Sequence, residues 1–128
     1  MSTLLQSKLA ENPEKTAQVS LSVFFEIMQA WHVKKTAQRT LLGNPPESIF
    51  YNWANGKFSI LSNDTLERIS CIIAIYKALN LLFSSREQAH AWPSKANQAF
   101  SEQSTIEFMV SGSVIQFHDV RRYLDSQL

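Results

Sequence analysis

The residues that most often perform catalysis or bind metal ions are few in this sequence, and they lie far apart. His32, His90 and His118 are isolated, without a cysteine or carboxylate at the spacing that metal ligands require. We interpret each as a surface or half-buried side chain and predict no metal site. Asp119 and Asp125 are six residues apart on one expected helix, so their carboxylates do not point to a common position.

The remaining reactive groups also lack the surroundings that catalysis requires. Cys71 stands alone within an apolar run, where a cysteine is most often a small buried hydrophobic residue. The three glycines do not form a phosphate-binding loop, and no serine lies in a nucleophile elbow. An enzyme is therefore the least supported class of protein, and we predict that the chain acts by binding, without a cofactor.

Composition limits the size and class of the protein but not its partner. The 128 residues suffice for one compact domain, or for two very small domains that share a core. A hydrophobic fraction of 45% excludes wholesale disorder, and a net charge of +1 leaves the class of partner open. The first residues lack the pattern of a signal peptide, and the most apolar run is too short to span a bilayer, so we expect a cytoplasmic protein.

Apolar residues at spacings of three and four predict an all-α fold of about six or seven helices. We expect residues 1–19 to form a flexible arm and the first helix to start at Ser20. Two short helices follow, the first stopped by Gly43 and the second, with Pro46 in its first turn, stopped by Gly56. No stretch of useful length alternates as a strand does.

The segment from residue 63 to residue 83 is apolar on most of its sides, which predicts a buried central helix. Arg68 and Lys77 are expected on its solvated side. The last helix is expected to begin near Ser113. Pairs of residues with the spacing of a capping box predict the starts of three helices: Asp64 with Glu67, Ser84 with Glu87, and Ser104 with Glu107.

The first half of the chain has the order of a helix-turn-helix unit, in which a turn containing glycine joins two short helices. In such a unit the second helix enters the major groove of DNA. Asparagine can read adenine, serine and tyrosine can bind phosphate, and basic side chains can hold the DNA backbone. The predicted DNA-binding residues are Lys34, Lys35, Arg39, Ser48, Tyr51, Asn52, Asn55 and Lys57.

Three observations leave this interpretation open. Two helices joined through glycine are common in all-α proteins of other functions. Glu47, in the presumed recognition helix, repels phosphate, and residues 44–46 lengthen the turn before it. We therefore expect weak binding by each monomer, which a homodimer on two half-sites would strengthen.

Several short pieces of sequence occur in a defined order between residues 22 and 125. They are LLG…W, DTLERIS, IYKAL, W…N…F, M..G and VRRYLD. In this order they resemble the MbcA/ParS/Xre antitoxins, over nearly the whole chain apart from the arm. The resemblance implies an Xre-like helix-turn-helix domain over residues 20–62 and, joined to it through the central helix, a toxin-binding domain over residues 63–128. It implies two partners, operator DNA and a RES-domain toxin that depletes NAD.

Antitoxins of this family block the active-site cleft of the toxin, in part with their C-terminal end, and the complex regulates its own operon. Arginine is over-represented at binding hot spots, and tyrosine adds rigid contact area. Deletion of the residues after Val120 is therefore expected to abolish neutralisation of the toxin and to leave DNA binding intact. The toxin-binding residues that the resemblance implies are Trp92, Asn97, Phe100, Arg121, Arg122, Tyr123, Asp125 and Leu128.

The sequence departs from the family pattern in the loop that precedes and follows Phe100. Ala96 stands where the family often has proline, and Ser101 and Glu102 stand where it often has two glycines. Loss of those glycines removes a tight turn with positive φ angles, so the shape of this loop stays open.

Two alternatives remain. The segment from His118 to Leu128 is either a contact element for a toxin or an ordinary final helix, solvated outside and packed on the core through Val120 and Leu124. The whole chain is either an antitoxin or a stand-alone helix-turn-helix regulator without a toxin partner.

Overall fold

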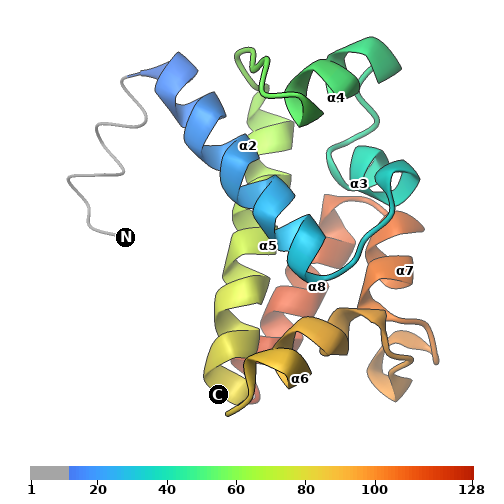
Figure 1. Cartoon of the computed structure of the whole chain (residues 1–128). Coiled ribbons are helices and arrows are strands. Elements are labelled where there is room, and N and C mark those ends of the chain that lie inside the picture. Colours follow the sequence, from blue (N-terminus) through green and yellow to red (C-terminus); the bar gives the residue numbers. More distant parts are fainter. Residues whose placement is uncertain (1–11) are drawn as a thin grey trace.

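The protein is all-helical, as predicted, in a computed structural model that describes residues 12–128 (Figure 1). These residues form no strand and contain a single β-bridge, between Ala96 and Ser104. The 3-10 helices are η1 (Trp92–Ser94) and η2 (Gln98–Phe100). The α-helices are α2 (Pro13–Ala30), α3 (Lys35–Leu41), α4 (Glu47–Ala54), α5 (Asn63–Leu82), α6 (Arg86–Ala91), α7 (Thr105–Val110) and α8 (Val114–Asp125).

Helix α2 begins earlier than the sequence analysis expected. The Asn12 side chain caps it by accepting a hydrogen bond from the Lys15 amide at 3.0 Å. Pro13 takes the first helical position, where its missing N–H costs nothing. Ala17 is buried. The prediction of a flexible arm is therefore wrong for residues 13–19, and residues 1–11 lie outside the described part of the chain.

Helices α2, α3 and α4 each end in a reversal with positive φ angles just past the helix, at one residue after α2 and α4 and at two residues, Gly43 and Asn44, after α3. Gly43 (φ 92°) and Gly56 (φ 85°) take this position after α3 and α4, as predicted. After α2 the position belongs to His32 (φ 55°), and the Val33 amide donates to the carbonyl oxygen of Met28 at 3.0 Å. These reversals produce the sharp changes of direction between the first helices in Figure 1.

Helix α5 is the centre of the molecule, as its apolar sequence predicted. It packs against α2, α6 and α8, and Figure 1 shows it running the length of the fold. Ile69, Ile72, Ile75 and Leu79 on α5 are almost completely buried. Cys71 is buried with them, which confirms its interpretation as a small core residue.

The starts of α7 and α8 are capped as the sequence indicated. At α7 the Glu107 amide donates to Ser104 Oγ at 3.1 Å, and the Ser104 amide donates to Glu107 Oε1 at 3.0 Å. Both bonds of the predicted capping box are therefore present. Because Ser104 donates hydrogen bonds to the charged carboxylate, the pKa of Glu107 is held below its usual value. Ser113 and Gln116 form a second capping box at α8.

Two other predicted caps are wrong by one or two residues. Helix α5 is capped by Ser62, whose Oγ accepts from the Thr65 amide at 3.2 Å, and not by Asp64. Helix α6 is capped by Ser85 and not by Ser84. Likewise Pro46, predicted in the first turn of α4, is its N-cap residue.

One hydrophobic core joins the two halves of the chain. Phe24 and Phe50 from the first half and Phe117 and Leu124 from the second belong to the same cluster of buried side chains. Helix α3 also packs against α7. The predicted boundary near residue 62 therefore lies inside one packed body. No helix between residues 12 and 128 is both long and apolar enough to cross a membrane.

The surroundings of the two helix-ending glycines lead to a testable difference. A Cβ atom at Gly43 would lie 3.1 Å from Asp64 Oδ2 and 3.2 Å from Arg68 Nε, whereas a Cβ at Gly56 meets nothing within 4 Å. We expect Gly56→Ala to lower the free energy of unfolding by about 1 kcal/mol, from left-handed strain alone. Gly43→Ala should cost about 1 kcal/mol more, because the neighbouring pair must also move. Urea unfolding of both variants measures the difference, and equal losses would contradict this contact.

Candidate binding surfaces

The α3–α4 unit carries the predicted DNA-binding residues on its outer surface. Seven of the eight are exposed, and Arg39 is the exception. Tyr51 on α4 is 51% exposed, and its ring packs edge-on against the buried Phe50 ring at a centroid distance of 5.3 Å. Asn52 and Ser48 are exposed on the same short helix. Helix α4 therefore presents an aromatic ring backed by the core, with amide and hydroxyl groups beside it.

Basic residues lie at both ends of this unit. Lys34 is the N-cap residue of α3, and Lys35 is the first residue of the helix. The Lys35 amine lies over the Phe25 ring, 5.4 Å from its centroid. Lys57 directly follows Gly56 at the end of α4, and it is exposed. The three lysines thus lie at the two ends of the α3–α4 unit, and their contact with the DNA backbone stays a prediction.

Arg39 makes contacts within the α3–α4 turn that the sequence did not predict. Its Nε donates to the carbonyl oxygen of Pro45 at 2.6 Å, and its guanidinium lies 3.7 Å from the Glu47 carboxylate. These contacts fasten the turn between α3 and α4. Arg39 therefore holds the long turn in shape, and the charge of Glu47 is partly offset by a neighbouring cation.

An aromatic cluster forms the second candidate surface, and it joins η1, η2, α7 and α8. The Trp92 and Tyr123 rings are stacked, with centroids 6.5 Å apart and an angle of 15° between the ring planes. Phe100 meets the Tyr123 ring edge-on at 5.4 Å and stacks with Phe108 at 4.9 Å. Phe100 is buried, while Trp92 and Tyr123 are half-buried. Phe100 therefore packs in the core beneath the other two rings, and Trp92 and Tyr123 are partly exposed at the surface.

The loop around Phe100 keeps the shape that glycines would have supplied. Ser101 (φ 56°) and Glu102 (φ 65°) both adopt left-handed conformations. The Asn97 carbonyl oxygen accepts hydrogen bonds from the Phe100 and Glu102 amides, each at 3.0 Å, and the Asn97 side chain accepts one from Ala99 at 2.9 Å. The sequence left the shape of this loop open. The structure shows a tight turn with positive φ angles at Ser101 and Glu102, formed without glycine.

This turn predicts a stabilising substitution. A non-glycine residue in the left-handed region costs about 1–2 kcal/mol, part of which glycine recovers despite its larger entropy in the unfolded chain. We expect Ser101→Gly and Glu102→Gly each to raise the free energy of unfolding by up to about 1 kcal/mol. Ser94→Gly serves as the control, because Ser94 is exposed and does not have a positive φ angle. This substitution should be neutral or destabilising. Thermal unfolding of the three variants measures the effect, and a loss of stability in both loop variants would contradict it.

The end of α8 carries several exposed charged groups. Arg121, Arg122, Asp125 and Leu128 are exposed, and an Arg122 amino nitrogen lies 2.6 Å from the Asp119 carboxylate. The buried side of the same helix is formed by core residues, which include Val120 and Leu124. The predicted packing of the last helix on the core through Val120 and Leu124 is therefore confirmed. Most of the residues of α8 that were predicted to bind a toxin lie on its exposed side, where their role stays a prediction.

A polar cluster between α5 and α8 was not foreseen from the sequence. His118 Nε2 lies 2.9 Å from Glu67 Oε1, and the His118 Nδ1 atom lies 3.7 Å from Cys71 Sγ. Burial raises the pKa of the Cys71 thiol above its usual value, against an opposing effect of the nearby Arg121 cation. The thiol is therefore protonated at neutral pH, and its burial keeps substrates away from it. No group of three or more His, Cys, Asp or Glu residues within residues 12–128 could hold a metal ion.

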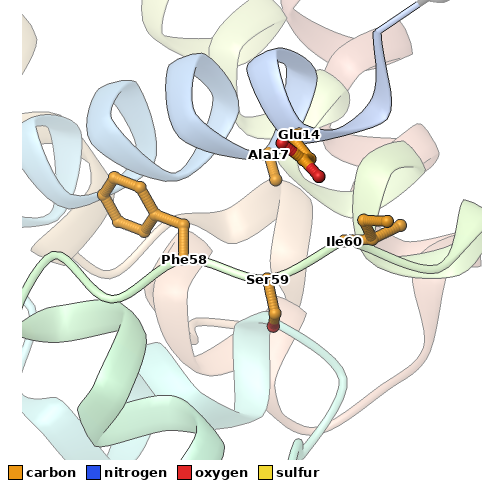
Figure 2. A pocket seen from close by; sticks show the side chains of 5 residues that line it. All are labelled: Glu14, Ala17, Phe58, Ser59 and Ile60. Atoms are coloured by element: carbon orange, nitrogen blue, oxygen red, sulfur yellow. The ribbon is translucent and has the colours of Figure 1, made fainter.

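Two shallow hollows lie where α2 meets the loop before α5. The first, of about 220 Å³, is lined by Glu14 and Ala17 of α2 and by residues 58–60 (Figure 2). Figure 2 shows Ser59 pointing away from α2, and its Oγ accepts a hydrogen bond from Trp53 Nε1 at 2.8 Å. The second, of about 380 Å³, adjoins it at Ile60. In the first hollow Glu14 supplies the one carboxylate, and the other lining residues are small or apolar. A catalytic pocket usually has several polar groups that converge on one place, and this hollow does not.

The structure is that of an all-α protein in which helices α2–α4 and the helices that follow α5 share one core. The chain is 38% identical to the uncharacterized protein y4oB of Sinorhizobium fredii over 107 residues, which are 84% of this chain and 82% of y4oB. It belongs to the same family as y4oB. No protein-family model matches the chain, and no solved structure matches it.

Proposed function

We propose that the chain is an antitoxin of a type II toxin–antitoxin system, which binds and blocks a RES-domain toxin that depletes NAD. It also binds operator DNA and thereby regulates its own operon, in the cytoplasm where NAD and DNA are found. The ordered sequence pieces shared with the MbcA/ParS/Xre antitoxins support this proposal. The observation that carries it is the end of α8, where Arg121, Arg122 and Asp125 are exposed and where Tyr123 stacks on Trp92.

The chemistry of this end of α8 fits a binding cleft that normally holds an anionic dinucleotide. Asp125 is an exposed anionic group in the last turn of α8, so it can occupy the place of a negatively charged ligand. Arg121 and Arg122 are donors suited to carboxylates on the rim of such a cleft. Tyr123 and Trp92 are held in place by their mutual stacking and by Phe100, so little rotamer entropy is lost when they bind.

The α3–α4 unit supports the proposed regulatory role. Asn52 and Tyr51 project from α4, and lysines lie at both ends of the unit. Helix α4 has only eight residues and its first residue is Glu47, so each copy of the chain offers few contacts to DNA. A homodimer, or a larger complex with the toxin, supplies the second half-site that such weak binding needs.

Neutralisation of the toxin is the direct test of the proposal. A RES-domain protein encoded beside this gene is expressed in bacteria with and without the chain, and growth and cellular NAD are measured. We expect the toxin alone to stop growth and deplete NAD, and the chain to restore both. If NAD falls equally with and without the chain while the chain binds DNA, the stand-alone regulator is the better account.

The DNA-binding role makes a separate prediction. We expect Tyr51→Ala combined with Asn52→Ala to weaken binding to the DNA upstream of the gene by about 10- to 100-fold, since each lost contact to a base or phosphate costs about 1–2 kcal/mol. Gln18→Ala combined with Gln29→Ala removes two exposed residues of α2 and serves as the control. Fluorescence anisotropy at fixed salt measures the affinities, and equal affinities of the two double variants would rule out α4 as the recognition helix.

A further inference from the structure

Arg68 on α5 is a cation withdrawn from solvent, although it was expected on the solvated side of its helix. Its side chain is only 15% exposed. Its Nε donates to Asp64 Oδ2 at 2.9 Å, one helical turn earlier. Its guanidinium carbon lies 5.4 Å from the centroid of the Phe117 ring on α8, over the ring face where cations are attracted.

The same side chain also lies against the turn between α3 and α4. A Cβ atom at Gly43 would lie 3.2 Å from Arg68 Nε and 3.5 Å from its Cδ, so any other residue there would press on the arginine side chain. The hydroxyl of Thr65, in the first turn of α5, also points to this place and lies 3.4 Å from the carbonyl oxygen of Leu42. The start of α5 thus packs against the end of α3 through Thr65, Asp64 and Arg68.

We infer that Arg68 is a positioning residue that couples the α3–α4 turn to α8, so that a partner bound on α8 changes the affinity of α4 for DNA. This inference rests on the proposed function in naming those two ligands. The structural part of the inference, that the orientation of α4 depends on the packing of α8, does not rest on the proposed function.

A single side chain suffices for this coupling because of its charge. A guanidinium that has lost most of its water is retained only while Asp64 and the Phe117 ring both compensate it. A shift of α8 that moves the ring releases the guanidinium toward solvent and empties the space against Gly43. The structure shows the packed arrangement of Arg68, and the inferred coupling requires a second, released arrangement that favours a different placement of the turn.

Because Arg68 lies outside both proposed binding surfaces, a substitution there can test the coupling without removing a contact to DNA or to the toxin. Arg68 meets Asp64, Phe117 and Gly43, and none of these belongs to either proposed binding surface. A variant at this position consequently leaves the side chains that face DNA and toxin unchanged. Arg68→Met keeps an unbranched apolar stem and removes the charge, whereas Arg68→Lys keeps a cation and serves as the conservative variant.

Hydrogen exchange tests the structural part without any partner. We compare the wild-type protein with both variants by mass spectrometry under conditions where all are folded. Arg68→Met should raise exchange at least about threefold both at residues 41–47 and within α8, while α6 stays unchanged, since local opening follows the loss of local contacts. Arg68→Lys should lie close to the wild type. A change confined to the first turns of α5, or one spread evenly over the chain, would overturn the inference.

Affinity for DNA tests the regulatory part. The affinity for the DNA upstream of the gene is measured with and without saturating RES-domain protein. We expect the toxin to change it about fivefold or more in the wild type, as is typical of coupled sites, and less than about twofold in Arg68→Met. The same ratio in both proteins would overturn the coupling. If the wild type binds neither ligand, the proposed function has failed, and the exchange pattern alone decides the coupling.

Discussion

Replacing Arg121 and Arg122 together with alanine should weaken binding of the RES-domain toxin by at least about a hundredfold, and toxicity should return in cells. Both side chains are exposed on α8, the helix whose Tyr123 stacks on Trp92. Arginines at the centre of an interface commonly cost about 2 kcal/mol or more each when truncated, and about 2.8 kcal/mol corresponds to a hundredfold loss. Isothermal titration calorimetry with a catalytically inactive toxin measures the affinity, and growth measures neutralisation.

A matched variant separates this effect from a general change of charge. Lys15→Ala with Arg86→Ala also removes two positive charges from exposed positions, far along the chain from α8. This control should bind toxin as the wild type does. Equal affinity of the two double variants would show that α8 does not contact the toxin. Circular dichroism establishes that both remain folded, since exposed ion pairs such as Arg122 with Asp119 contribute little to stability.

Point substitution is a cleaner test than deletion of the residues after Val120. Leu124 is 2% exposed and belongs to the core, and Tyr123 packs on Trp92 and Phe100. A deletion that removes both side chains lowers stability by several kcal/mol, roughly as a large-to-small core substitution does. Loss of neutralisation by that deletion would therefore report unfolding as much as loss of contact.

Phe117→Ala should lower the free energy of unfolding by about 3–5 kcal/mol, the range for a large aromatic ring removed from a packed core. Phe117 is completely buried in the cluster that contains residues of both halves. Because this core is shared, the loss should appear in the first half as well, including the surroundings of Trp31 and Trp53. Urea unfolding followed both by tryptophan fluorescence and by circular dichroism measures it.

Ile115→Ala on the same helix is the control, because Ile115 is 62% exposed and its truncation should change stability by less than about 0.5 kcal/mol. Phe117→Leu should fall between the two variants and provides a measurable protein if the alanine variant does not fold. Two separate transitions in the wild type, with only the later part of the chain affected by Phe117→Leu, would contradict a shared core.

Helix positions followed from periodicity wherever the apolar pattern was strong. The stripe on α8 and the capping box of Ser104 with Glu107 were both predicted correctly. The caps of α5 and α6 were missed because each segment offers several side chains able to cap, and spacing alone does not choose among them. The start of α2 was missed because its first turns are polar, although Asn12 followed by Pro13 is a typical cap and first helical residue.

The candidate sites were harder to predict, for a physical reason that Arg39 and Arg68 share. Both were assigned to the surface because isolated charges usually are. In the folded chain Arg39 is tied to Pro45 and Glu47, and Arg68 lies between Asp64 and Phe117. Such contacts depend on which distant residues the fold brings together, and no local spacing encodes them. The exposed residues of α4 and α8 were easier to predict, because exposure follows directly from helical periodicity.

The most direct measurement of the central claim is co-purification of the tagged chain from its native cells, followed by mass spectrometry. The antitoxin proposal predicts a RES-domain protein in a stoichiometric complex, and it predicts that the Arg121→Ala, Arg122→Ala double variant loses that protein. Recovery of the chain with its own DNA but without such a partner, in cells that express the neighbouring genes, would contradict the proposal and leave the chain as a regulator alone.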